Sequence, residues 1–215
     1  MPDKIYFISG LGADKKVFRN LIINHPFQQH IEWEIPFKNE SLTSYCSRLI
    51  TQIDTRSEVI LVGLSFGGII AQEIAKIIPV RKLIIVSSVK NENEMDWTLH
   101  FIRKTKLYKL PPSLLKFLNK YTANYYFGIQ SEEESLLLKK IIADTNPVFL
   151  PWANNQILHW KNHLSQNVVH IHGTKDKIFP IKNITNCMPI EGGGHFMILN
   201  KAKEVSAFIN QAIGA

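Results

Sequence analysis

Residues Val62–Gly68 read VGLSFGG and place a single serine, Ser65, between glycines at the end of an apolar run. The preceding residues, Val59–Val62, are all apolar, which is typical of a strand buried on both faces in the middle of a parallel sheet. The following stretch, GGIIAQEIAKIIP, has isoleucines at helical spacing and ends at Pro79, so it predicts a helix. Ser65 is therefore expected at a sharp strand-to-helix corner, where the turn exposes its hydroxyl and the helix directs free N–H groups toward it.

Strand and helix patterns alternate on both sides of this corner. Strands are predicted at residues 4–9, 31–37, 59–62, 83–86 and 168–171, and helices after Asp14 and at 41–53, 67–78 and 201–213. Alternation of this kind indicates a parallel sheet with helices on both faces. The sequence thus predicts the α/β class, as a three-layer αβα sandwich with a mostly parallel sheet.

From residue 91 to residue 163 the strand pattern disappears and only helical patterns remain. Helices are predicted in PSLLKFLNKY (112–121), SEEESLLLKKIIADT (131–145) and PVFLPWANNQILHW (147–160). This stretch is interpreted as an insertion and not as a second folding unit. We therefore expect one domain over residues 1–215, with a core of 1–90 and 164–215 and a helical cap of 91–163.

The composition fits a protein with one sizeable hydrophobic core. The chain has 215 residues, of which 45% are hydrophobic, and a formal net charge of +7. No apolar run approaches the length of about 18 residues that a membrane span needs, and MPDKIYFISGLG lacks the basic and long apolar regions of a secretory signal. We expect a cytoplasmic protein without stable membrane insertion. The positive charge can attract anionic partners, but no zinc-finger, RNP or P-loop pattern supports nucleic-acid binding, and two cysteines without CxxC spacing indicate neither a zinc site nor a disulfide framework.

A nucleophilic serine needs a general base and a carboxylate that orients this base. Among the eight histidines, His195 lies in the glycine-rich stretch EGGGHFM, where no hydrophobic periodicity explains it as a core residue. His170 and His172 alternate within a predicted strand and are more simply read as structural. Asp176, in HGTKDKIFP, follows the strand 168–171, and the carboxyl edge of a parallel sheet is where an open α/β fold gathers its site.

The identity of the carboxylate is open between two loops. Glu92, Glu94 and Asp96 follow the strand 83–86 in KNENEMD and compete with Asp176. Asp176 is favoured because GTKD comes directly after a strand and Pro180 then opens a new segment. The rival acids lie in a polar stretch that leads away toward the predicted cap.

Together these stretches resemble the motifs of the α/β-hydrolases. GLSFGG resembles the nucleophile elbow, HGTKDKIFP the acid loop and GGGHF the histidine loop, and IYFISGLGAD is similar to the first core strand with its oxyanion loop. The resemblance implies that Ser65 is the nucleophile, His195 the base and Asp176 the acid, and that the N–H groups of Phe66 and Leu11 form the oxyanion hole. It also implies a helical cap and a site without metal or organic cofactor.

The chain departs from the pattern of this family at two places. Ser9 stands before the glycine of the oxyanion loop, where many members have histidine. The usual leading antiparallel strands are absent, which leaves an expected sheet of about six strands.

The chemistry implied is acyl transfer to water. We expect a serine hydrolase that cleaves a carboxylic ester or thioester of a small to medium apolar substrate through an acyl-enzyme. Trp97, Trp152 and Trp160 of the cap are candidates for substrate binding, although aromatic residues at helical spacing more often pack in a core. The alternatives are a non-catalytic small-ligand-binding protein on the same fold, or a lyase or C–C bond hydrolase with the same triad.

The cap also carries a basic stretch without acids, which is read as a solvated face, as a site for the anionic tail of a thioester, or as an interfacial contact. Its members are Arg103, Lys104, Lys106, Lys109, Lys116 and Lys120.

Overall fold

Six parallel strands form one sheet in the computed structural model, which describes residues 3–105, 122–163 and 167–214. The strands are β1 (Lys4–Ile8), β2 (Gln28–Ile31), β3 (Val59–Leu64), β4 (Lys82–Val86), β5 (Val168–Gly173) and β6 (Met188–Ile190). Their order across the sheet is β2-β1-β3-β4-β5-β6, and every neighbouring pair is parallel. The predicted α/β class and number of strands are confirmed, and the sheet is wholly rather than mostly parallel.

Side chains that alternate along the central strands supply a separate apolar cluster on each face of the sheet. In β3, Leu61 belongs to the cluster under the first helices of the chain, while Ile60 and Val62 belong to the cluster under the last helix. Every residue of β3 is buried. The continuous apolar run that predicted this strand therefore reflects contact with helices on both sides, as parallel sheets require.

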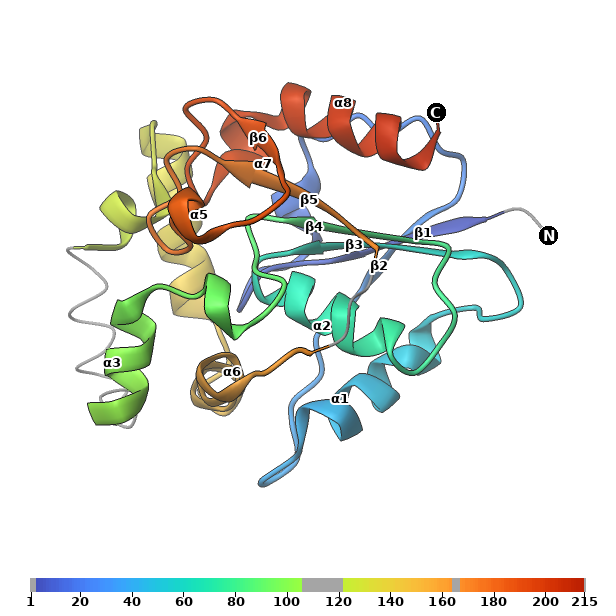
Figure 1. Ribbon diagram of the computed structural model, residues 1–215, viewed down its shortest axis with the longest axis horizontal. Helices are drawn as coiled ribbons and strands as arrows, with labels where there is room; N and C mark the ends of the chain where they lie inside the picture. The colour runs from blue at the N-terminus through green and yellow to red at the C-terminus, as the bar shows by residue number, and fades with distance from the viewer. Residues whose placement is uncertain (1–2, 106–121, 164–166, 215) are drawn as a thin grey trace.

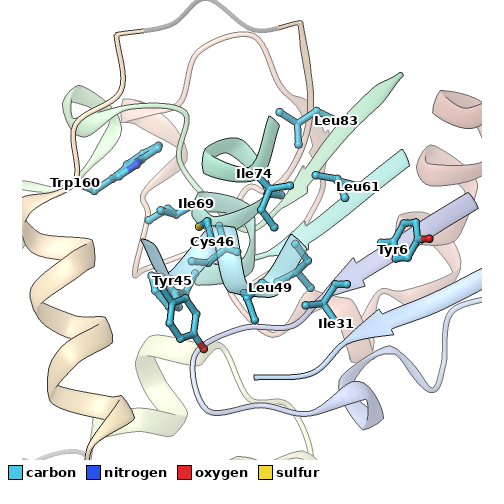
Figure 2. Packing of buried hydrophobic residues seen from close by; sticks show 14 of the residues in the cluster. Tyr6, Ile31, Tyr45, Cys46, Leu49, Leu61, Ile69, Ile74, Leu83 and Trp160 are labelled. Carbon is cyan, nitrogen blue, oxygen red and sulfur yellow. The ribbon is translucent and has the colours of Figure 1, made fainter. Parts of the chain in front are cut away.

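Helices cover both faces of the sheet and give the predicted three layers (Figure 1). On one side lie α1 (Leu42–Leu49) and α2 (Phe66–Ala75), and on the other α8 (Ala202–Ile213), which follows the short α7 (Met197–Asn200). Ser41 begins α1 by accepting a hydrogen bond from the Ser44 N–H. Figure 2 shows Tyr45, Leu49, Leu61 and Ile74 packed in the cluster that α1 and α2 share with the sheet.

The polypeptide between β4 and β5 contains helices, turns and loops but no strand in the residues that the structure describes. It contains a 3₁₀ turn, η3 (Glu92–Glu94), then α3 (Trp97–Thr105), helical residues 122–127, α5 (Glu132–Asp144) and α6 (Phe149–His159). The helices predicted at 131–145 and 147–160 are thereby confirmed. The helix predicted at 112–121 lies outside the described residues, as do Lys106, Lys109, Lys116 and Lys120 of the basic stretch.

The chain returns from this insertion to the core along α2. Trp160 is buried, and its indole N–H donates a hydrogen bond to Glu73 Oε1 at 2.7 Å. Two residues later, Asn162 Nδ2 donates to Gln72 Oε1 and to the Lys90 carbonyl. In the described parts of the chain, no helix has the length and apolar character needed to cross a membrane.

Two local predictions are wrong, and one strand was missed. The strand expected at 31–37 is β2 at Gln28–Ile31, so that only Ile31 is shared. The helix expected after Asp14 is only a 3₁₀ turn, η1 (Lys15–Phe18), although Asp14 caps it as predicted. The edge strand β6 was not predicted, because three residues that include a proline carry no periodic signal. Two further 3₁₀ turns, η2 (Ile50–Gln52) and η5 (Ile181–Asn183), complete the described elements.

Candidate active site

Ser65 occupies the corner between β3 and α2 in a conformation that L-residues rarely adopt. Its φ is 52° and its ψ is −116°, and its N–H donates to the Val86 carbonyl of the neighbouring strand at 2.9 Å. Glycine flanks the corner because the backbone is crowded there. A Cβ on Gly63 would lie 2.3 Å from the Gly67 carbonyl oxygen, and a Cβ on Gly67 would lie 2.2 Å from the Ile8 carbonyl oxygen.

His195 and Asp176 complete a hydrogen-bonded series that starts at Ser65. His195 lies in the loop between β6 and α7, and its Nε2 is 2.9 Å from Ser65 Oγ. Its other ring nitrogen, Nδ1, is 2.8 Å from Asp176 Oδ2. A carboxylate only accepts hydrogen bonds, so Nδ1 carries the proton and Nε2 is left to accept the serine hydroxyl proton.

A tight loop after β5 holds the Asp176 carboxylate in a fully buried position. Its Oδ1 accepts hydrogen bonds from the N–H groups of Ile178 and Phe179, each at 2.9 Å. Burial by itself would raise the pKa of Asp176, but the adjacent His195 and the Phe179 N–H hold this pKa below its ordinary value. The buried acid is therefore an anion that can stabilise a positive charge on His195.

The three rival carboxylates bond to other groups. Glu94 is buried and accepts hydrogen bonds from the N–H groups of Lys90 and Thr185. Glu92 Oε2 accepts from the Asn162 N–H, and Asp96 Oδ1 accepts from the Thr98 N–H at the start of α3. The contact with His195 thus belongs to Asp176, and of the earlier acids Glu94 joins the segment after β4 to Thr185.

The loop after β1 lies directly beside the serine. A Cβ built on Gly10 would be 3.6 Å from Ser65 Cβ, which brings the next residue, Leu11, to the side of the corner. Ser9 Oγ donates to the Ala13 carbonyl at 2.6 Å and so closes this loop from inside. Neither the Leu11 N–H nor the Phe66 N–H, at the first position of α2, donates to any described part of the chain.

Solved structures share the fold of this protein over nearly the whole chain. A thermophilic esterase aligns with a TM-score of 0.67 and 18% identity over 97% of this chain and 88% of its own. A bromoperoxidase from Bacillus anthracis gives 0.68 and 18% over 100% and 93%, and ClbQ from the colibactin NRPS/PKS pathway gives 0.66 and 12% over 100% and 98%. The chain has the α/β-hydrolase fold. No family model and no curated protein matches its sequence.

Two aromatic rings flank the histidine of this α/β-hydrolase fold. The rings of Phe127 and Phe179 lie 5.3 and 5.6 Å from the His195 ring, both edge to face. The Phe127 carbonyl also accepts the Phe196 N–H at 2.9 Å, so the insertion contacts the histidine loop through backbone as well as side chain. Sequence reasoning missed both residues. Phe179 lies in the HGTKDKIFP motif, so its closeness to Asp176 could have been predicted. Nothing in the sequence around Phe127 indicates a contact with His195.

The three tryptophans proposed for substrate binding occupy different environments. Trp97 is 69% exposed at the start of α3. Trp160 is buried against α2, as Figure 2 shows beside Ile69, which is a packing position. Trp152 on α6 is half-buried, with its ring 4.4 Å from Tyr45 and 6.2 Å from Phe66, the residue after the serine. Of the three, Trp152 has a ring contact with the residue that follows Ser65.

A groove of about 300 Å³ is lined in part by the loop after β1. Gly12 and Ala13 form one wall, and Trp33, Ile141 and Phe149 contribute apolar surface. None of Ser65, Asp176 and His195 lines it. In the described residues no group of three His, Cys, Asp or Glu side chains is placed to hold a metal ion.

Proposed function

We propose that this protein is a serine hydrolase that cleaves a carboxylic ester or thioester of a small to medium apolar substrate. The observation that carries the proposal is the continuous hydrogen bonding from Ser65 Oγ through His195 to the buried Asp176 carboxylate. Such a series activates a hydroxyl that is otherwise a weak nucleophile. The resemblance of the fold to esterases is consistent with this chemistry.

The reaction proceeds in two acyl-transfer steps. Ser65 Oγ attacks the carbonyl carbon while His195 Nε2 takes the hydroxyl proton, and Asp176 stabilises the resulting imidazolium. His195 then gives that proton to the leaving alcohol or thiol, which releases it and leaves an acyl-serine. A water molecule attacks the acyl group with His195 again as base, and the acid product leaves with Ser65 restored.

The N–H groups of Phe66 and Leu11 are proposed to hold the negative oxygen that develops at each step. Neither group has an acceptor among the described residues, and the Phe66 N–H lies at the positive end of α2. Loss of one such donor typically raises the barrier by about 3 kcal/mol. A loss of this size corresponds to about 100-fold in rate, so both N–H groups are expected to matter to catalysis.

The helices between β4 and β5 are proposed to form a cap that supplies the substrate surface. Phe127 against His195 and Trp152 against Phe66 are its apolar contacts with the site. These contacts favour an apolar acyl or alcohol group. Arg103 and Lys104 are basic residues at the end of α3 and could attract the anionic tail of a thioester substrate. A thioester of this kind is a variant of the same proposal.

Covalent labelling tests the proposal directly. A fluorophosphonate should modify Ser65, identified by mass spectrometry of the labelled peptide, and Ser65→Ala should abolish both the label and steady hydrolysis of p-nitrophenyl esters. A single burst without turnover would point instead to a ligand-binding protein, and labelling without cleavage of any ester or thioester to a lyase or C–C bond hydrolase. A label on another serine of the folded protein would refute the assignment.

A further inference from the structure

Two buried histidines on β5 lie directly behind the Asp176 carboxylate. His170 Nε2 is 3.1 Å from His172 Nδ1, and His172 Nε2 is 2.8 Å from the Phe179 carbonyl oxygen. Neither ring reaches Ser65, and both are at most 1% exposed. The sequence patterns attribute no role to them beyond packing in a strand.

The partners of these rings determine where their protons lie. A carbonyl oxygen can only accept, so His172 Nε2 carries a proton and donates it to Phe179. Burial lowers the pKa of His172 and lowers that of His170 to about 2, so both rings are neutral. His172 Nδ1 then carries no proton and accepts a hydrogen bond from the N–H at His170 Nε2. The direction of every hydrogen bond in the pair follows from the Phe179 carbonyl.

This carbonyl belongs to the residue that also holds the acid. The Phe179 N–H donates to Asp176 Oδ1 at 2.9 Å, while the Phe179 carbonyl accepts from His172 at 2.8 Å. The backbone N–H and the backbone carbonyl of Phe179 therefore both hold the loop of Asp176 in place. The Phe179 ring also contacts the ring of His195. His172 Nε2 itself lies 3.7 Å from Asp176 Oδ2, too far for a hydrogen bond but close enough for its N–H dipole to favour the anion.

We propose that His172 is a positioning residue that fixes the Asp176 loop, and through it His195, by donating its Nε2 proton to the Phe179 carbonyl. This inference rests on the proposed serine hydrolase function, because positioning matters to catalysis only if His195 is the base. His170 donates to Nδ1 of His172, but the Phe179 carbonyl already sets the tautomer of His172, so His170 has no part in the proposed positioning. Lys90 and Glu94 are the other charged groups that affect the pKa values of this pair. Both lie in the segment that follows β4.

Three substitutions separate positioning from simple packing. His172→Gln places an amide N–H near the former Nε2 and can still reach the Phe179 carbonyl, whereas His172→Leu and His172→Asn cannot. His170→Leu is the matched control, because it removes a buried histidine from the same strand without touching the acid loop. Leu at either position is expected to lower stability to a similar extent, so stability alone does not distinguish the two.

The decisive readout is the low-field proton resonance of His195 Nδ1–H in the free protein, together with the pH profile of ester hydrolysis. His172→Leu or His172→Asn should shift or abolish this resonance, lower kcat about 10- to 100-fold with little change in KM, and move the acid limb of kcat/KM to lower pH. His172→Gln and His170→Leu should keep the resonance and a kcat within about threefold of the wild type.

The proposal would be overturned if His170→Leu and His172→Leu lost the resonance and kcat equally, or if His172→Gln restored neither. His172 would then be a packing residue. If His172→Leu does not fold, the comparison of His172→Gln with His172→Asn gives the same discrimination. The resonance needs no substrate. A protein that turns over no ester but loses the signal only in His172→Leu and His172→Asn would refute the proposed function and leave the positioning role standing.

Discussion

Gly67 is the position at which one added methyl group would separate the two proposed oxyanion donors. In Gly67→Ala the new Cβ would meet the Ile8 and Ser9 carbonyl oxygens at 2.2 and 2.3 Å. Both are backbone atoms of β1 and its loop, so no side chain can turn away. The first turn of α2, which carries the Phe66 N–H, must move away from the loop that carries the Leu11 N–H.

The size of the effect follows from these distances. A comfortable contact requires the methyl carbon to retreat by about 1 Å, since non-bonded heavy atoms settle near 3.5 Å. Overpacking of this kind costs about 1–3 kcal/mol of stability, offset by about 1 kcal/mol because alanine favours a helix over glycine. A displacement of about 1 Å at the reacting groups typically costs about 100-fold in rate. Gly67→Ala should therefore fold with a modest loss of stability and a large loss of kcat.

The assay compares Gly67→Ala with Gly214→Ala in urea unfolding, fluorophosphonate labelling and ester hydrolysis. At Gly214, the left-handed residue that ends α8, an added Cβ meets nothing within 4 Å, and the strain at φ +82° costs about 1 kcal/mol far from the site. Similar losses of stability with about 100-fold slower labelling only in Gly67→Ala would support the reasoning. Wild-type labelling rates in Gly67→Ala would refute it.

Three further tests use substitutions in and around the site. Asp176→Asn should fold normally yet lower kcat about 10³- to 10⁴-fold, while Glu94→Gln should lower stability and keep turnover. Near-normal kcat in Asp176→Asn together with a large loss of kcat in Glu94→Gln would instead assign the catalytic acid to the loop after β4. His170 has a folded-state pKa far below the ordinary 6.5, so its contribution to stability is complete above pH 6.5 and is lost as the pH falls; His170→Leu should flatten the decline of the urea midpoint below pH 6.5, and parallel curves would contradict this. Trp160→Phe should lower stability by about 1–3 kcal/mol without altering acyl-chain preference, whereas Trp152→Phe should alter the preference, as measured over a series of p-nitrophenyl esters; equal preference in both variants would argue against Trp152 as a substrate contact.

The sequence predicts the centre of the sheet better than its edges, for a physical reason. Strands β3 and β4 are buried on both faces, so their residues had to be apolar and the pattern is visible. The edge strand β2 begins with two exposed glutamines, Gln28 and Gln29, which carry no strand signal. The alternation read at 31–37 is misleading because Ile35 and Phe37 are exposed in an irregular loop and do not face the core.

The candidate site divides in a similar way. Ser65, Asp176 and His195 were predicted because each lies in a short motif whose spacing relative to a strand is fixed by local geometry. The contact of Phe127 with His195 joins segments that are far apart in the sequence, and no local pattern encodes it. The environment of His172 was also out of reach, since alternation along a strand gives the face of a residue but not its hydrogen-bond partner.

The position of the insertion has a consequence for how the chain folds. β4 pairs with β5, yet residues 87–167 lie between the two strands. Closing a flexible segment of this length costs about 2 kcal/mol more in entropy than closing one of ten residues. During synthesis, β1 to β4 emerge first and leave β4 as an apolar edge that is open to pairing with other molecules. Ser65 can therefore reach its folded position with β1 to β4 before Asp176 and His195 reach theirs. We expect catalytic activity to appear only in the slow, late phase of folding in which β5 pairs with β4.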